Sequence, residues 1–152
     1  MIIGIISDTH GTLNAEVLKI FKGAAHIIHA GDIGSAEIIA TLARVAPVTA
    51  VRGNTDNSDW SLSIPYRELI TLADLGFYIL HDLHQLDLEP PAAGISAVIS
   101  GHTHQPETSQ RDGVLYMNPG SASQRRHGGP LSVGRIRTAG KRLHAEIIHL
   151  QL

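Results

Sequence analysis

An alternation of apolar runs and helix-like segments in the first third of the chain restricts the fold it can adopt. Three apolar runs of strand length, Ile2–Ile6, His26–Ala30 and Val48–Val51, are separated by two segments whose apolar residues recur at helical spacing. Continuous apolar runs of this length are typical of strands that are buried on both faces. Because strand–helix–strand units form right-handed crossovers, the three strands are expected to lie parallel in one sheet.

The two intervening segments carry their own helix signals. In the first, apolar residues recur at helical spacing from Leu13 to Phe21, and Asn14 can cap the amino end. Gly23 is expected to end this helix, because glycine readily adopts the left-handed conformation found just past helix ends. Ser35 opens the second helix.

The remainder of the chain is richer in strands. Short apolar runs predict strands at Glu68–Leu72, Phe77–His81, Ala97–Ser100, Val114–Met117, Leu131–Ile136 and Leu143–Leu150, the last of these at a sheet edge. We expect a hairpin turn over Ala73-Asp74-Leu75-Gly76 and a short helix within 83–88. Two sheets packed face to face with helices outside would hold these elements in a single domain, residues 1–152.

Composition narrows the classes of function. The chain has 152 residues, enough to bury roughly 70% of the unfolded surface. Its net charge of −2 disfavours binding to a nucleic acid polymer or an anionic membrane, and no apolar run approaches the ~20 residues of a membrane span. The chain has no cysteine, which excludes thiol nucleophiles, and it has ten histidines, which favours metal chemistry. We expect a cytoplasmic enzyme.

Four polar clusters follow apolar runs that we expect to be strands. They are Asp8-Thr9-His10, Gly31-Asp32, Gly53-Asn54-Thr55-Asp56 and Gly101-His102-Thr103-His104. The carboxyl ends of parallel strands meet at one edge of a sheet, where open α/β sheets bind their ligands. His81, which ends a further apolar run, adds another imidazole. The sequence therefore predicts that these side chains converge.

Seven side chains in these positions are candidate metal ligands: Asp8, His10, Asp32, Asn54, His81, His102 and His104. Mixed oxygen and imidazole ligands suit Mn²⁺, Fe, Zn²⁺, Ni²⁺ or Co²⁺ better than Mg²⁺ or Ca²⁺. A carboxylate can bridge two cations, which a histidine cannot do. Two metals ~3.5–4 Å apart lower the pKa of a bridging water and clamp a phosphoryl oxygen, so this ligand set favours hydrolysis of a phosphate ester.

The four clusters, in this order, resemble the motifs of the calcineurin-like metallophosphoesterase superfamily. The short chain and the stretch Asn118-Pro119-Gly120-Ser121 are similar to its small YfcE-like phosphodiesterase branch, and the resemblance extends from Asp8 to Ser121. It implies an α/β fold, a four-layer α/β/β/α sandwich of two mixed sheets.

The resemblance also implies how the ligands are divided between two metals. A first metal would be held by Asp8, His10, Asp32 and His104, and a second by Asp32, Asn54, His81 and His102, with Asp32 bridging. Catalysis would depend on Asp32, Asn54 and His102, with attack by a metal-bridging hydroxide. The implied activity is hydrolysis of small phosphodiesters with two divalent metal ions, Mn²⁺ first and Ni²⁺, Co²⁺, Fe or Zn²⁺ as alternatives.

Two positions depart from the superfamily pattern. The fourth motif usually reads His-Gly-His, whereas here the segment is His81-Asp82-Leu83-His84, which favours His81 over His84 as ligand and places a carboxylate, Asp82, near the metals. Many larger members also carry a histidine after the asparagine as general acid, where this chain has Thr55. The leaving group would then have to be a good one, unless water or Asp56 protonates it.

Other residues have both a structural and a functional interpretation. His29 lies within a strand and is expected to be a core residue or to orient a ligand. Arg125 and Arg126 are interpreted first as solvated loop charges and second as a phosphate site. Trp60 and Tyr66 could line a substrate pocket, cover the core or pack in a homo-oligomer contact.

Two other functions compete with the phosphodiesterase. The fold also occurs in a retromer subunit that serves as an assembly component, so the chain could be a scaffold or binding protein. In the other alternative the metals are kept, and the substrate is a phosphomonoester or a pyrophosphate. The complete ligand set favours the phosphodiesterase.

Overall fold

Two mixed β-sheets form the framework of the protein in a computed structural model that describes residues 1–124 and 129–151. The first sheet has the order β10 (Arg142–His149), β9 (Ser132–Ala139), β1 (Ile2–Ile6), β2 (His26–His29) and β3 (Val48–Ala50). The second has the order β4 (Arg67–Leu72), β5 (Leu75–Leu80), β6 (Ile95–Ile99), β8 (Val114–Asn118) and β7 (Glu107–Arg111). These sheets agree with the predicted fold class.

Each sheet has parallel strands at its centre. Strands β1, β2 and β3 pair in parallel, as the alternation of apolar runs and helices predicts, and β9 and β10 extend the sheet by antiparallel pairing. In the second sheet β5, β6 and β8 pair in parallel, while β4 and β7 are antiparallel edge strands. The carboxyl ends of both parallel sets therefore provide loops at the ligand-binding edges of the two sheets.

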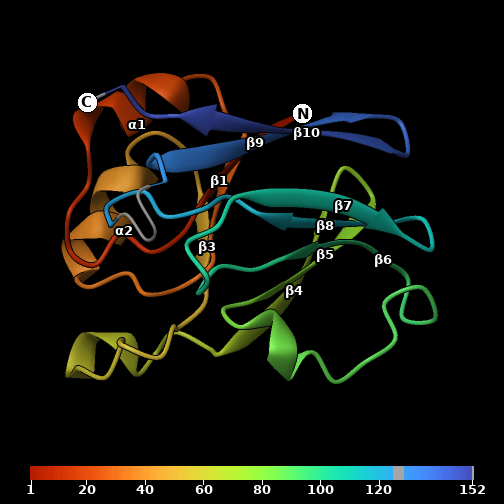
Figure 1. Ribbon diagram of the computed structural model, residues 1–152, viewed down its shortest axis with the longest axis horizontal. Coiled ribbons are helices and arrows are strands. Elements are labelled where there is room, and N and C mark those ends of the chain that lie inside the picture. Colours follow the sequence, from red (N-terminus) through yellow and green to blue (C-terminus); the bar gives the residue numbers. More distant parts are fainter. Residues whose placement is uncertain (125–128, 152) are drawn as a thin grey trace.

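Both α-helices in the described part of the chain pack on the outer face of the first sheet, away from the second (Figure 1). Helix α1 (Ala15–Ile20) begins after Asn14, whose side chain accepts a hydrogen bond from the backbone N–H of Glu16, as the sequence predicts. Helix α2 (Ala36–Ala43) begins after Ser35, without a side-chain cap bond. The Phe21 ring lies against Gly4 of β1, where an added Cβ would come within 2.9 Å of the ring.

The main hydrophobic core lies between the two sheets. Ile5 and Ile28 of the first sheet belong to one buried cluster with Phe77, Ile99 and Met117 of the second. Burial of each such side chain contributes about 1.5–3 kcal/mol relative to exposure. This core fixes the sheets against each other and thereby fixes their loop-bearing edges.

The outer face of the second sheet has a thin cover. The 3₁₀ helix η2 (Leu83–Gln85) and the chain after it place Leu83, Leu86 and Leu88 against Tyr78, Leu80 and Val98. The short helix predicted within 83–88 is thus a single 3₁₀ turn, which Asp82 caps through the backbone N–H of His84. A second 3₁₀ turn, η1 (Asp59–Ser61), follows β3.

Two details of the strands differ from the sequence prediction. Strand β7 was not expected, because its residues Glu107–Arg111 are polar and mostly exposed, as is common on an edge strand. The turn between β4 and β5 is shorter than predicted. Ala73 and Asp74, with φ of 51° and 64°, form a two-residue hairpin turn, so β5 begins at Leu75.

No helix in the described part of the chain combines the length and hydropathy needed to cross a bilayer.

Candidate metal centre

The seven predicted ligands all lie in loops that directly follow parallel strands. Asp8 and His10 follow β1, Asp32 follows β2, Asn54 follows β3, His81 follows β5, and His102 and His104 follow β6. Because both sheets present these loops at the same end of the molecule, side chains from sequence positions 8 to 104 meet there.

A first group consists of Asp8, His10 and His104, which each place one ligand atom within 4.8 Å of the other two. The Oδ1 atom of Asp8 lies 3.2 Å from Nε2 of His104 and 3.7 Å from Nε2 of His10. All three residues are buried or half-buried.

A second group consists of Asp8, Asp32 and His81, with the same 4.8 Å spacing of ligand atoms. Nε2 of His81 lies 3.3 Å from Oδ2 of Asp32 and 3.9 Å from Oδ1 of Asp8. The same Oδ2 atom of Asp32 also lies 3.7 Å from Nε2 of His10 in the first group. Both aspartates therefore reach both groups, whereas the family resemblance gives the bridging position to Asp32 alone.

Several ligand atoms at the centre have no hydrogen-bond partner among the described residues. These are Oδ1 of Asp8 and Nε2 of both His10 and His81, and all three atoms are buried. Leaving a buried donor or acceptor unpaired costs roughly 1–3 kcal/mol, and more for a charged group. A divalent cation would satisfy these atoms, because carboxylate oxygen and imidazole nitrogen are its usual ligands. The residues present therefore fit a metal centre.

Hydrogen bonds from surrounding groups orient the ligands. The Ser7 hydroxyl donates to Oδ2 of Asp8 at 2.6 Å, and the backbone N–H of His102 donates to the same oxygen at 3.2 Å, which leaves Oδ1 directed at the centre. The backbone N–H of Thr55 donates to Oδ1 of Asp32. Nδ1 of His81 lies 2.7 Å from the carbonyl of Ala30 and donates to it, so Nε2 is free of a proton when the ring is neutral.

The close contacts shift the pKa values of these groups in opposite directions. Burial opposes ionisation of Asp8 and Asp32, yet the adjacent imidazoles of His10 and His81, together with hydrogen bonds from the Ser7 hydroxyl to Asp8 and from the Thr55 backbone N–H to Asp32, hold both carboxyl pKa values below their ordinary range. Asp8 raises the pKa of His10, and Asp32 raises the pKa of His81 against the effect of burial. Because a metal must displace the imidazole protons, its affinity is expected to rise with pH.

Asn54 and His102 lie beside the two groups. Nδ1 of His102 is 3.2 Å from Oδ1 of Asn54, and the His102 ring meets that of His81 edge to face, with centroids 5.2 Å apart. Asn54 is exposed and His102 is half-buried. They therefore form the solvent side of the centre, where a substrate would enter.

The ligand loops require unusual backbone conformations. Five of the ligand residues have positive φ values: Asp8 (58°), His10 (46°), Asp32 (54°), His102 (73°) and His104 (62°). Such conformations are uncommon for residues other than glycine, and they are concentrated at functional sites. Gly53 and Gly101 allow the loops to approach closely, because a Cβ at Gly53 would collide with the Asp32 carboxylate and one at Gly101 with the Ser7 hydroxyl.

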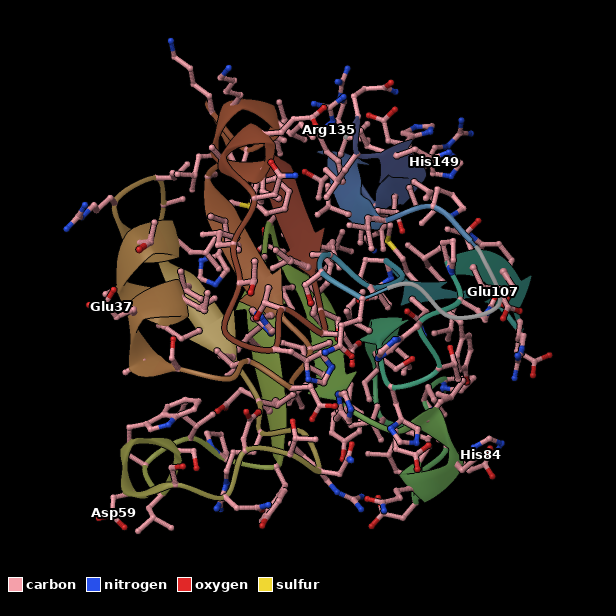
Figure 2. All side chains as sticks on the ribbon, turned by 60° about the vertical axis from the view of Figure 1, so that its left-hand side comes forward. Glu37, Asp59, His84, Glu107, Arg135 and His149 are labelled. Carbon is pink, nitrogen blue, oxygen red and sulfur yellow. The ribbon has the colours of Figure 1, made fainter. Side chains whose placement is uncertain are left out.

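The structure separates His81 from His84. His81 is 6% exposed and lies in the second group, whereas the His84 side chain is 91% exposed and projects outward from η2 (Figure 2). The carboxylate of Asp82 accepts from the N–H of His84 and lies 3.3 Å from its ring, so it caps η2. Asp82 also lines the cavity beside His81 and His102.

Asp56 does not have the role of a proton donor that the sequence allowed for it. It is 2% exposed, and its carboxylate accepts hydrogen bonds from the backbone N–H groups of Ile33, Gly34 and Gly53. These donors engage both carboxylate oxygens, which leaves them little capacity for a further contact. Asp56 therefore fastens the loop after β2 to the loop after β3.

His29 is buried behind the ligand loops and holds their backbone through hydrogen bonds. This agrees with the prediction that it is a core residue or one that orients a ligand. The N–H of Gly31 donates to Nδ1 of His29, so Nε2 carries the proton and donates to the Thr9 hydroxyl at 3.0 Å. Thr9 donates in turn to the carbonyl of Ile33. Complete burial lowers the pKa of His29 to about 4, which keeps the ring neutral.

The segment 118–123, at the end of β8 and just after it, forms hydrogen bonds to two of the ligand loops. The Asn118 amide donates to the carbonyl of Gly101 and to the Thr103 hydroxyl. The hydroxyls of Ser121 and Ser123 donate to the carbonyl of Asp8. The resemblance in this segment thus has a structural basis, since these contacts hold the backbone next to two ligand loops.

Four other residues were considered for a substrate or phosphate site, and the structure places them differently. Trp60 packs against the core on the helix side of the first sheet, whereas Tyr66 is 60% exposed and lines the cavity beside the centre. Arg125 and Arg126 lie outside the described residues. A third arginine, Arg52, also lines that cavity and was missed by sequence reasoning, although its position directly before Gly53-Asn54 was a signal that could have identified it.

Comparison with known proteins gives one family. The model of the calcineurin-like phosphoesterase superfamily domain matches residues 1–141. A probable metallophosphoesterase from Methanothermobacter thermautotrophicus is 34% identical over 97% of this chain and 92% of its own length. The phosphodiesterase YfcE from Escherichia coli K12 is 29% identical over 86% of this chain and 84% of its own length.

Solved structures show the same fold. An archaeal phosphodiesterase superposes with a TM-score of 0.82 and 30% identity, over 97% of this chain and all of its own. Vps29 from Entamoeba histolytica, in a complex with Zn²⁺, superposes with a TM-score of 0.78 and 19% identity over 98% of this chain and 99% of its own. At this level of identity, the similarity to Vps29 shows a shared fold and nothing further.

Proposed function

Because the chain belongs to the calcineurin-like phosphoesterase superfamily and is a metal-dependent phosphoesterase, we propose that it hydrolyses small phosphodiesters with two divalent metal ions, Mn²⁺ first among them. The observation that carries the proposal is the pair of ligand groups that share Asp8, with buried ligand atoms that have no hydrogen-bond partner in the described chain.

The two groups suggest where the metals would be held. Asp8, His10 and His104 would hold one, and Asp8, Asp32 and His81 the other, with Asn54 and His102 completing the second site from the solvent side. When bound, two divalent cations lower the pKa of a water and stabilise the charge that develops on the phosphoryl oxygens.

The protein's own residues favour substrates with good leaving groups. Thr55 offers only a neutral hydroxyl, which is a poor acid, and the carboxylate of Asp56 is occupied by backbone donors, so neither residue is suited to protonate a leaving oxygen. Asn54 and His102 stand at the entrance, where they can donate hydrogen bonds to a substrate. An aryl ester, whose leaving group is stable as an anion, is therefore expected to react faster than an alkyl ester.

The direct test is a rate comparison with purified protein. Bis(p-nitrophenyl) phosphate is expected to be hydrolysed in the presence of Mn²⁺, more weakly with Ni²⁺ or Co²⁺, and hardly after treatment with a chelator. A higher rate with p-nitrophenyl phosphate would assign the site to phosphomonoesters instead. Protein that binds Mn²⁺ but hydrolyses neither ester would contradict the proposal.

A scaffold function on the same fold predicts a different result. In that case Asp32→Ala and His104→Ala would leave any residual diesterase signal unchanged, because the signal would come from a contaminant. If the proposal holds, both substitutions remove the signal. A cytoplasmic location and a homo-oligomeric state stay predictions.

A further inference from the structure

A small cavity opens directly beside the metal centre. It has a volume of about 160 Å³, and Asn54, His81 and His102 form the wall on the side of the centre. Ligand pockets for whole drug-sized molecules are typically ~300–1,000 Å³, so this cavity fits only one part of a substrate. The same cavity is also lined by Arg52, Tyr66, Arg67 and the carboxylate-bearing Asp82, and the side formed by Arg52, Tyr66 and Arg67 is called its arginine wall below.

The two arginines of this wall differ in their partners. Nη1 of Arg67 lies 2.7 Å from Oδ1 of Asp87, so its charge is paired. Arg52 forms no ion pair with a carboxylate among the described residues, and both Nε of Arg52 and Nη1 of Arg67 are buried without a hydrogen bond of regular geometry there, so the ion pair is what distinguishes the two. Arg52 is therefore the cation on this wall that is available to a ligand.

Tyr66 holds the Arg52 side chain in place. The guanidinium carbon of Arg52 lies 4.0 Å from the centroid of the Tyr66 ring, which is the distance of a cation–π contact. A stacked guanidinium keeps its N–H donors in its own plane, where they can bind two oxygens of a phosphate at once. The stacking also restricts the long side chain before a ligand arrives, which lowers the entropic cost of binding.

We propose that Arg52, positioned by Tyr66, binds the phosphoryl oxygens of the substrate and makes this cavity a phosphate-recognition site next to the metal centre. This inference rests on the proposed function, because it identifies the residue that would hold the phosphoryl group there. Arg52 would act through binding, so its loss should raise KM more than it lowers kcat.

The molecule contains a matched control for this arginine. Arg111 lies over the ring of Tyr116, with its guanidinium carbon 4.7 Å from the centroid. Its backbone pairs with Val114 at the start of β8, whereas the metal loops lie at the other end of the parallel strands. Arg111→Met therefore removes the same charge and the same kind of stacking away from the centre.

The test measures binding of inorganic phosphate to the Mn²⁺-loaded protein by calorimetry, alongside KM for bis(p-nitrophenyl) phosphate. Arg52→Met is expected to raise both the phosphate Kd and the KM by ~10- to 100-fold, the effect of losing a hydrogen bond to a charged group. Arg52→Lys should give a smaller increase, and Arg111→Met should stay close to wild type. Tyr66→Leu, at an exposed position, should raise the phosphate Kd while Tyr66→Phe does not.

The outcomes separate this inference from the proposed function. If the wild-type protein hydrolyses the diester but Arg52→Met and Tyr66→Leu bind phosphate as tightly as wild type, the inference fails and the function stands. If the wild-type protein has no hydrolytic activity but Arg52→Met still weakens phosphate binding, the phosphate site stands and the function fails. A loss of phosphate binding in Arg111→Met of equal size would also overturn the inference, because it would indicate a general charge effect.

Discussion

Two buried aspartates, Asp56 and Asp8, occupy neighbouring regions of the molecule and have opposite surroundings. Both are almost completely buried, with exposed fractions of 2% and 0%. The Asp56 carboxylate accepts from three backbone N–H groups, and both of its oxygens are engaged. Oδ2 of Asp8 accepts two hydrogen bonds, whereas Oδ1 has no hydrogen-bond partner in the described chain and faces three imidazoles.

This difference shows how the same residue type can serve folding in one place and ligand binding in another. A carboxylate that is saturated by backbone donors stabilises the fold and has little capacity left for a ligand. A buried carboxylate oxygen that lacks a hydrogen-bond donor keeps its capacity to bind a ligand, and such a feature is expected where function requires it. The positive φ values of the ligand residues fit the same interpretation, because strain of this kind is concentrated at functional sites.

The largest expected effect is the loss of hydrolytic activity when Asp8 is substituted. Asp8→Asn removes the charge shared by both ligand groups, and it should reduce Mn²⁺-dependent diesterase activity ~10³-fold or more, since a metal site supplies several kcal/mol of transition-state stabilisation. The free energy of unfolding of the metal-free protein should fall by less than it does in Asp56→Ala, because Asn keeps an oxygen that can accept the hydrogen bonds of Ser7 and His102. A urea titration measures the second quantity, and a large loss of stability in this variant would contradict the comparison.

Substitution of Asp56 should mainly lower the stability of the fold. Asp56→Ala leaves the backbone N–H groups of Ile33, Gly34 and Gly53 without their acceptor, and it should lower the free energy of unfolding by about 3–5 kcal/mol. Equilibrium urea unfolding of the metal-free protein measures this change. An unchanged midpoint would show that the carboxylate does not fasten the two loops.

His29 should make the protein sensitive to acid. Its pKa is about 4 in the folded protein and ~6.5 when unfolded, so between these values the unfolded state alone binds a proton. The contribution of His29 is therefore fully present above pH ~6.5 and decreases by about 3 kcal/mol as the pH falls to 4. His10 and His81, whose pKa values are raised, act in the opposite direction.

The contributions of these histidines to stability overlap in pH, so the test compares wild type with a variant that lacks His29. The unfolding free energy of metal-free wild type and of His29→Asn is measured between pH 7 and pH 4.5. The variant is expected to lose less stability over this interval than wild type does. Parallel curves would mean that His29 does not stay neutral in the folded state.

The sequence predicts most of the positions of this site and few of its contacts. Strands β1, β2 and β3 follow from apolar runs, and His81 is preferred to His84 because it ends such a run. The role of Asp56 is not visible in the sequence, and Arg52 is marked only by its position directly before Gly53-Asn54. Backbone donors 22 and 23 residues away engage Asp56, and the ring that holds Arg52 is 14 positions along the chain, so tertiary packing decides both.

Prediction of the fold outside the site from the sequence is limited for the same reason. Strand β7 is a polar strand at the edge of the second sheet, next to β8, so no hydrophobic pattern marks it. The outer cover of the second sheet is a 3₁₀ turn, because packing of three leucines against Tyr78, Leu80 and Val98 sets its form more strongly than local helix propensity does.

The central claim, two metal sites that share Asp8, is tested most directly by counting bound metal. Mn²⁺ binding to wild type and to Asp8→Asn is measured by calorimetry at pH 7.5, with elemental analysis of the gel-filtered complexes, and Asp82→Asn serves as the control carboxylate that caps η2. We predict two Mn²⁺ ions per wild-type chain, two in Asp82→Asn, and loss of tight binding at both sites in Asp8→Asn. Two tightly bound ions in Asp8→Asn, or at most one in wild type, would contradict the account.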